Sequence, residues 1–197
     1  PPLIDSPFDK NVCRDKFSIK HGCFVLGCLG RLHDQKNVSF AIDVVAGCEN
    51  TMLYIAGVGP LEEQLKEKVV ALGIGERVVF LGSIHGQDIT SFYKAIDVLL
   101  FPSLFEGFGR VLIEALSEGV LVLANDIPVV REVAGVAAVL LPLDSNKWIS
   151  TVTSIQSNYS KFEGYSLKGV ERSQLFSVDS MVDQYLEAAG LPERKNA

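Results

Sequence analysis

The feature that most constrains the fold of this chain is a set of six short apolar runs in which polar and apolar residues do not alternate. Segments with the apolar periodicity of helices separate these runs. Strands that are apolar on both faces and are joined by helices are typical of a parallel sheet covered on both sides. The expected strands are residues 23–29, 52–56, 78–81, 98–101, 120–124 and 138–141.

The segments between the runs carry signals for the ends of helices. Pro60 can open a helix, Gly73 and Gly119 can each end one, and Asp144 can accept hydrogen bonds at the start of another. We therefore predict an α/β fold: a doubly wound, Rossmann-like, six-stranded parallel sheet in the order 3-2-1-4-5-6, with extra C-terminal helices. The expected helices are residues 37–48, 61–72, 87–95 and 110–117, a helical turn at 130–134, and helices after residue 144.

Length and composition fit one substantial domain. The chain has 197 residues, of which 48% are hydrophobic and 21% are charged, as is ordinary for a globular protein. A net charge of −6, without a basic stripe, argues against nucleic-acid binding. We expect a leading linker over residues 1–22, one domain over residues 23–190 that includes the C-terminal helices, and a flexible tail over residues 191–197.

The four cysteines contain no Cys-x-x-Cys pair. Cys23 and Cys28 lie within an apolar run, where cysteine behaves as a small hydrophobic residue. Metal binding and a disulfide framework stay open, but reduced thiols in a cytosolic protein are the better interpretation. No apolar run reaches the roughly 18 residues that a transmembrane helix needs.

The loop after the first strand contains Gly30, Arg31 and Lys36. In a doubly wound sheet, ligands bind beyond the carboxyl ends of the strands where the strand order reverses, here between the first and fourth strands. Arg31 can hold a phosphate through two nitrogens, Lys36 can add a point charge, and Gly30 lets the backbone approach a ligand closely. The alternative is that both cations are surface residues near a helix start, although a cation there opposes the helix dipole.

The loop after the fourth strand contains Glu106 and two glycines, which leave backbone N–H groups uncovered where a helix begins. Such a helix start is a ready anion site. Glu114 follows inside the apolar run of that helix, where a carboxylate needs a partner. The partner is either Arg110, four residues earlier, or a vicinal diol such as that of a ribose, and the residues alone favour the two equally.

Smaller features have more than one interpretation. The segment Gly57-Val58-Gly59-Pro60 fits either a ligand-facing loop or a tight strand-to-helix turn. His33 and His85 lie on loops without visible catalytic partners, so we interpret them as solvated. The chain has no Gly-x-x-x-x-Gly-Lys-Ser/Thr loop and no Gly-x-Gly-x-x-Gly after the first strand, which disfavours a P-loop NTPase and an ordinary dinucleotide dehydrogenase.

Taken in order, these motifs resemble the C-terminal domain of retaining GT-B glycosyltransferases of the group 1, or family 4, type. The resemblance covers residues 23–145, and its most specific element is the spacing of seven residues between Glu106 and Glu114. The matching segments are Gly30-Arg31-Leu32 with Lys36, Gly57-Val58-Gly59-Pro60, Val79-Phe80-Leu81-Gly82, Ala95-Ile96-Asp97-Val98, Pro102-Ser103, Glu106-Gly107-Phe108-Gly109 with Glu114-Ala115, Asn125-Asp126 and Arg131-Glu132-Val133.

The resemblance implies roles for the matching residues. As catalytic residues, Arg31 and Lys36 would bind the donor diphosphate and stabilise the leaving group, and Glu106 would contact the transferred sugar. The amides of residues 108–111 would hold sugar and phosphate, Glu114 would bind the ribose, and residues 80–82 would line the base pocket. The implied donor-binding residues are Gly30, Arg31, Lys36, Phe80, Leu81, Gly82, Gly107, Phe108, Gly109, Arg110, Val111 and Glu114.

The resemblance also implies a nucleotide-diphosphate sugar as donor substrate, retention of anomeric configuration, no cofactor and no bound metal. It implies an N-terminal acceptor-binding domain that is missing from this chain or supplied by another. We therefore expect a hexosyltransferase-type enzyme of polysaccharide or glycoconjugate biosynthesis, incomplete for catalysis in this chain alone. We expect it in the cytoplasm, with membrane association only through the missing part. Asn37, Leu121 and Val129 replace the glycine, proline and glycine common in the family, which leaves the donor's identity open.

Two other functions stay open. A degenerate GT-B module could act as a non-catalytic scaffold, with Trp148 and Phe162 of the late helices docking on another domain. A sugar-nucleotide epimerase or a phosphorylase would share the fold. The spacing of the two glutamates disfavours the epimerase, and no lysine in a pyridoxal-binding context supports the phosphorylase.

Overall fold

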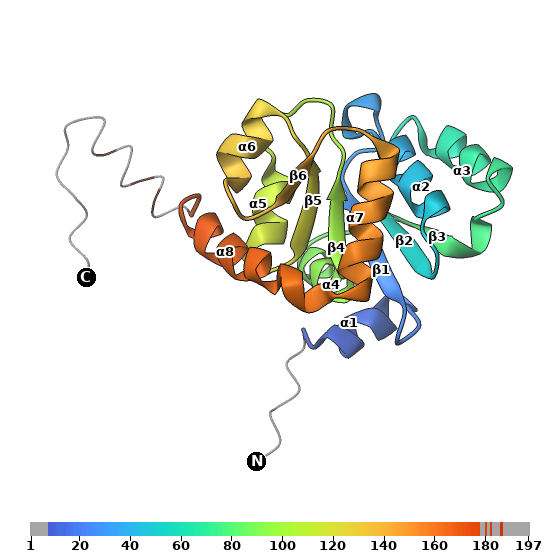
Figure 1. Ribbon diagram of the computed structural model, residues 1–197, viewed down its shortest axis with the longest axis horizontal. Helices are drawn as coiled ribbons and strands as arrows, with labels where there is room; N and C mark the ends of the chain where they lie inside the picture. The colour runs from blue at the N-terminus through green and yellow to red at the C-terminus, as the bar shows by residue number, and fades with distance from the viewer. Residues whose placement is uncertain (1–7, 178–179, 181, 183–185, 187–197) are drawn as a thin grey trace, which may run out of the picture.

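The chain folds around a six-stranded parallel sheet in the order β3-β2-β1-β4-β5-β6 (Figure 1). A computed structural model describes residues 8–177, 180, 182 and 186. The predicted fold class, strand number and strand order are confirmed. The expected flexible tail, residues 191–197, lies outside the described residues.

Strands and helices occur where the periodicity predicts them, and their ends differ from the prediction by one or two residues. The strands are β1 (Phe24–Leu29), β2 (Thr51–Ala56), β3 (Val78–Gly82), β4 (Val98–Phe101), β5 (Leu121–Asn125) and β6 (Val139–Leu141). The helices are α1 (Lys10–Lys16), α2 (Val38–Gly47), α3 (Glu62–Ala71), α4 (Gln87–Ala95), α5 (Arg110–Ser117), α6 (Pro128–Ala134), α7 (Ser145–Ser157) and α8 (Glu163–Gln174), with 3-10 turns η1 (Asp34–Lys36), η2 (Gly75–Arg77) and η3 (Tyr159–Phe162). No helix in the described part is both long and apolar enough to cross a bilayer.

Both faces of the sheet are buried, which explains why the strand sequences do not alternate. Successive side chains of a strand point to opposite faces. In β1, Val25 therefore joins an apolar layer with α1, α4, α5 and α6, whereas Leu26 joins a second layer with α2, α3 and α7. In β4, Leu99 and Leu100 divide between the same two layers. Most strand positions therefore hold apolar residues, because helices cover both sides of the sheet.

Helix α1 lies within the leading segment, residues 1–22, that the sequence analysis assigned to a linker. Asp9 caps the helix by accepting hydrogen bonds from the backbone N–H groups of residues 11 and 12. Cys13 is buried against the sheet layer, and Phe17, just after the helix, packs edge-on against Phe92 of α4 at 6.1 Å. A helix of seven residues has little stability of its own, so these tertiary contacts stabilise it.

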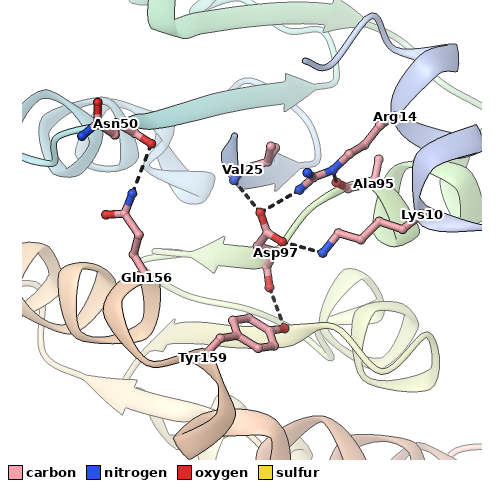
Figure 2. Close-up of polar contacts among 8 residues, drawn as sticks. All are labelled: Lys10, Arg14, Val25, Asn50, Ala95, Asp97, Gln156 and Tyr159. Atoms are coloured by element: carbon pink, nitrogen blue, oxygen red, sulfur yellow. Dashed lines mark hydrogen bonds and ion pairs between the residues drawn. The ribbon is translucent and has the colours of Figure 1, made fainter. Parts of the chain in front are cut away.

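A cluster around Asp97, at the amino end of β4, fastens α1 to the sheet (Figure 2). The Asp97 carboxylate accepts hydrogen bonds from the Val25 backbone N–H at 2.7 Å, from Arg14 at 2.8 Å and from Lys10 at 2.5 Å. The Asp97 backbone carbonyl accepts a bond from the Tyr159 hydroxyl at 3.2 Å, which brings η3 to the same edge. We call Lys10, Arg14, Val25, Asp97 and Tyr159 the Asp97 cluster. Its place at the amino edge makes it architectural, because ligands of such sheets bind at the carboxyl edge.

Trp148 of α7 is fully buried, so the suggestion that it docks on another domain is wrong. Its ring packs edge-on against Phe40 of α2 at 5.2 Å, and its indole N–H donates to the Pro142 carbonyl at 2.9 Å. Trp148 belongs to the core because α7 packs on the layer of the sheet that also contains α2 and α3. Phe162 is half-buried and stacks on Tyr165 at 6.3 Å.

All four cysteines are free thiols. Cys13, Cys28 and Cys48 are buried, and Cys23 is half-buried. Burial raises the pKa of Cys28 to about 12 and that of Cys48 to about 11. These three buried residues therefore act as apolar packing groups.

Candidate functional site

The loops that follow β1 and β4 are tied together at the carboxyl edge of the sheet, where the strand order reverses. The Leu104 backbone N–H donates to the Gln35 carbonyl at 2.8 Å, and the Gln35 side chain donates to the Phe105 carbonyl at 2.9 Å. The Asn37 side chain donates to the Pro102 carbonyl at 3.3 Å. These bonds hold the two loops that carry the predicted site residues in one fixed arrangement.

Asn37 explains how the first loop turns into α2. Its backbone is left-handed, with φ 49° and ψ 41°, between η1 and the first turn of α2. Asparagine is one of the few residues besides glycine that adopts this conformation readily. Asn37 can therefore stand where the family commonly has glycine, and its side chain adds the bond to the second loop.

Lys36 and Glu106 form an ion pair across the two loops. Their charged atoms are 2.6 Å apart, and their side chains are only 19% and 6% exposed. The Lys36 ammonium also lies 5.4 Å from the centre of the Phe101 ring. The structure thus brings together a cation and a carboxylate that the sequence analysis predicted as separate ligand contacts.

Arg31 lines a pocket of about 310 Å³ at the carboxyl ends of β1, β2 and β3. Its side chain is exposed, and no salt bridge or side-chain hydrogen bond to it occurs among the described residues. The pocket is lined by Leu29, Gly30, Arg31, Ala56, Gly57, Val58, Ser83 and Ile84. An unpaired guanidinium at the wall of a pocket is free to bind an anion.

Gly57 lets the loop after β2 approach the loop after β1. A Cβ at this position would lie 1.8 Å from the Gly30 carbonyl oxygen, and the backbone has φ +142°. The Leu32 N–H donates to the Val58 carbonyl at 3.0 Å across the same contact. Loop packing therefore explains the Gly57-Val58-Gly59-Pro60 segment, while Gly57 and Val58 also line the pocket.

The segment predicted to line a base pocket, Phe80, Leu81 and Gly82, forms the end of β3. The Gly82 carbonyl accepts a bond from the Gly57 N–H at 2.7 Å. The next two residues, Ser83 and Ile84, are the ones that line the pocket, and the sequence analysis missed them. Their position directly after a third strand that ends at the same edge was the available signal.

Helix α5 begins at the second loop without a side-chain cap. Gly109 precedes it in a left-handed conformation, with φ 79° and ψ 46°. Within the described structure, the backbone N–H groups of Arg110 and Val111 have no hydrogen-bond acceptor. Phe108 is exposed and packs edge-on against Phe176 at 5.8 Å. Gly107 is also exposed. N–H groups without an acceptor at a helix start are what an anion site requires.

Among the residues that the structure describes, two side chains contact the Glu114 carboxylate. Its Oε1 lies 3.7 Å from Arg110, whose side chain is 85% exposed, so this ion pair is weak. Its Oε2 accepts a hydrogen bond from the Tyr93 hydroxyl of α4 at 3.2 Å. The predicted Arg110 contact therefore exists, but the buried partner of Glu114 is Tyr93. Sequence reasoning missed Tyr93 because it lies on the apolar face of a predicted helix.

The described residues contain no group of three or more His, Cys, Asp or Glu side chains that could hold a metal ion. His85 is exposed and bonds to Ser83 at 2.8 Å. His33 is exposed at the start of η1. Both histidines therefore lie at the surface.

Comparison with known proteins places this arrangement in a family. The family model described as "Glycosyl transferases group 1" matches residues 9–157, which is more than half of the chain. Lipopolysaccharide core biosynthesis mannosyltransferase LpsB of Rhizobium meliloti is 32% identical over 130 residues, which cover 61% of this chain and 36% of that protein. D-inositol 3-phosphate glycosyltransferase of Mycobacteroides abscessus is 27% identical over 196 residues, which cover 95% of this chain and 44% of that protein. The chain thus spans less than half the length of either relative.

Solved structures share the fold. HepE of Anabaena, in complex with UDP and glucose, has a TM-score of 0.84 at 27% identity over 94% of this chain and 53% of that chain. A C-terminal domain of a group 1 glycosyl transferase from Francisella tularensis has a TM-score of 0.75 at 20% identity over 86% of this chain and 94% of that domain. The sheet and its helices therefore match one Rossmann-like half of a GT-B fold. By the match of its residues 9–157, this chain belongs to the group 1 glycosyl transferases.

Proposed function

We propose that this chain is the donor-binding domain of a retaining glycosyltransferase, which transfers a sugar from a nucleotide-diphosphate sugar to an acceptor. The acceptor would be held mainly by an N-terminal domain outside this chain. The observation that carries the proposal is the arrangement at the carboxyl edge: the Lys36–Glu106 pair, the unpaired Arg31 and the open start of α5 all belong to loops that meet there. Such an edge is where doubly wound sheets bind nucleotides.

The proposed roles follow from charge and position. Arg31 and Lys36 neutralise the donor diphosphate, and the uncapped N–H groups at the start of α5 add a positive dipole. Glu106, held by Lys36 at 2.6 Å, accepts a hydrogen bond from the transferred sugar. When a diphosphate reaches Lys36, the ammonium is shared between phosphate and Glu106, so donor binding and the orientation of Glu106 are coupled.

The proposed reaction needs no bound metal, because cations and backbone dipoles stabilise the charge that develops on the leaving diphosphate. This predicts that donor binding is unchanged when a chelator is added. We also propose a cytoplasmic enzyme, with any membrane contact made by the part outside this chain.

A uridine nucleotide is the first donor to test, because HepE, a structural relative at 27% identity, binds UDP. The experiment is calorimetric titration of this chain with UDP, GDP and ADP and with their glucose derivatives, with and without EDTA. We expect one of these ligands to bind with micromolar affinity. If none binds more tightly than about 1 mM, the proposal is refuted.

Arg31→Gln is the informative variant, because the side chain is exposed and has no partner among the described residues, so its loss should leave the fold intact. We expect the affinity for the nucleoside diphosphate to fall about tenfold, since a charge-assisted hydrogen bond is lost. Lys161→Gln is the matched control: it removes another exposed cation, on η3, which lies at the amino edge. Equal losses in the two variants would show a general charge effect and contradict the proposed role of Arg31.

For the alternative function as a scaffold, the sequence suggested Trp148 and Phe162 as docking residues, and Trp148 is buried. Two exposed apolar side chains beside the site, Leu104 and Phe105, are 47% and 62% exposed and keep a protein contact open at this loop. Self-association or protein binding without any nucleotide affinity would favour the scaffold function. Nucleotide binding that depends on Arg31 would exclude it as the whole function.

A further inference from the structure

Tyr93 is a buried residue whose hydroxyl contacts the Glu114 carboxylate in addition to a backbone carbonyl. This residue of α4 is 1% exposed and belongs to the apolar layer that also contains residues of α5. Its hydroxyl lies 3.2 Å from the Val111 carbonyl and 3.2 Å from Glu114 Oε2. A buried tyrosine hydroxyl needs a hydrogen-bond partner, and the Val111 carbonyl alone would satisfy it. The contact with the glutamate therefore calls for a separate reason.

The hydroxyl is the donor in this contact. Burial, and then the nearby negative charge of Glu114, raise the pKa of Tyr93. The phenol therefore keeps its proton, and this one hydrogen is shared between two acceptors, the Val111 carbonyl and the Glu114 carboxylate. A hydrogen bond to a charged acceptor is stronger than one between neutral groups, so it restricts the rotation of the Glu114 carboxylate.

The two oxygens of Glu114 are held unequally. Tyr93 holds Oε2 from the protein interior at 3.2 Å. Oε1 faces Arg110 at 3.7 Å, across a contact whose guanidinium is 85% exposed. The glutamate side chain itself is 35% exposed, and within the described part of the chain Oε1 has this weak ion pair but no hydrogen bond. A carboxylate fixed at one oxygen and free at the other is already oriented before a ligand arrives.

We propose that Tyr93 is a positioning residue that fixes the Glu114 carboxylate so that its other oxygen can bind the ribose hydroxyls of the donor nucleotide. This inference rests on the proposed function, in which Glu114 binds the ribose. Without the phenol, the carboxylate can turn toward the exposed Arg110 side chain and lose its orientation toward the sugar. The loss should then fall on recognition of the ribose and leave recognition of the diphosphate unchanged.

The alternative is that Tyr93 only holds α4 and α5 together. A neighbouring contact between the same two helices provides the control for this alternative. Lys94 of α4 donates to the Glu118 backbone carbonyl at 2.8 Å and pairs with its carboxylate at 3.1 Å. This contact joins α4 and α5 one residue beyond Tyr93 and one turn beyond Glu114. If Tyr93 only held the helices together, Lys94→Met would reproduce the effects of Tyr93→Phe.

The test measures, for each variant, the ratio of the affinity for a ribonucleotide to the affinity for the nucleotide that lacks the 2′ and 3′ hydroxyls. Titrations of the full chain use UDP, GDP and ADP, their 2′,3′-dideoxy counterparts, and inorganic pyrophosphate as the probe for the diphosphate contacts. The wild-type chain should prefer the ribonucleotide about tenfold or more, as expected for hydrogen bonds to a carboxylate. In Tyr93→Phe this ratio should fall about threefold, as expected when an oriented side chain becomes free to rotate.

Further variants separate the outcomes. Pyrophosphate affinity should be the same in Tyr93→Phe and the wild type, and Lys94→Met should keep the wild-type ratio. In a Glu114→Ala background, adding Tyr93→Phe should not change the ratio further, because the two residues act through one contact. An unchanged ratio in Tyr93→Phe, or an equal fall in Lys94→Met, overturns this inference alone. Failure of the wild type to bind any nucleotide overturns the proposed function, and this inference with it.

Discussion

Replacing Asp97 by alanine removes the acceptor on which the Asp97 cluster depends. The Arg14 side chain is 7% exposed and the Asp97 side chain 11%, so the change leaves a buried guanidinium without its counter-ion. Breaking a buried ion pair by removing one partner typically costs about 3–5 kcal/mol of unfolding free energy. The Val25 backbone N–H, which donates to Asp97 at 2.7 Å, also loses its acceptor. We expect a total loss of about 4 kcal/mol of unfolding free energy. The cost of the unpaired guanidinium and the cost of the unpaired N–H are not fully additive, because both groups contact the same carboxylate.

Trp148, the one tryptophan of the chain, is fully buried and should report unfolding by its fluorescence. With a urea dependence of about 2 kcal/mol per molar, a loss of about 4 kcal/mol lowers the unfolding midpoint by about 2 M. Lys10→Met is the matched control, because that cation is 47% exposed and its pair with Asp97 contributes at most about 1 kcal/mol.

Arg14 supplies the decisive comparison. Removing it together with Asp97, as Asp97→Ala/Arg14→Met, also removes the uncompensated charge. The double variant should therefore be more stable than Asp97→Ala alone. The reasoning is refuted if Asp97→Ala lowers the midpoint no more than Lys10→Met does, or if adding Arg14→Met makes the loss larger.

Two further predictions concern the loop contact and the buried thiols. Gly57→Ala should lower the free energy of unfolding by more than about 2 kcal/mol and weaken nucleotide binding, because its Cβ would meet the Gly30 carbonyl. Gly75→Ala, where an added Cβ meets nothing within 4 Å, is the control for urea denaturation and should have little effect. Burial raises the pKa of Cys28 from 9.0 to about 12, so the unfolded chain loses this proton at a lower pH than the folded chain. This contribution to stability is fully present below about pH 9 and is lost as the pH rises toward 12. In urea titrations at pH 8, 9 and 10, the free energy of unfolding should therefore fall less steeply with pH in Cys28→Ala than in the wild type. An equal slope in the two proteins would contradict this.

The fold was predictable from sequence because burial on both faces leaves a strong signal in every strand. Val25 and Leu26 pack on opposite faces, so consecutive strand residues must be apolar. Alternating strands and helices indicate a doubly wound sheet, and the order observed is the one most typical of Rossmann-like folds. Helix α1 left no such signal, because it depends on contacts with Phe92 and Asp97, which lie far away in the chain.

The site was predictable only in outline. The reversal of strand order indicates that Lys36 and Glu106 lie at one edge, but their direct pairing depends on the bonds between Gln35, Leu104 and Phe105 that fix the two loops. The Tyr93–Glu114 contact had no sequence signal, since a tyrosine on the apolar face of a helix looks like a core residue. Side-chain contacts between separate helices depend on packing angles that periodicity does not specify.

The motif segments around β4 combine two different roles. Asp97 precedes the strand at the amino edge, and Glu106 follows it at the carboxyl edge, where Lys36 holds it. Four strand residues separate the edges by roughly 13 Å, so the two charged groups do not share partners. Asp97→Ala should then reduce the fraction of folded chain and leave the nucleotide affinity of the folded fraction intact, whereas Arg31→Gln should do the reverse. The two edges can thus be tested separately, because the Asp97 cluster lies at the amino edge of the sheet and the proposed donor site lies at the carboxyl edge.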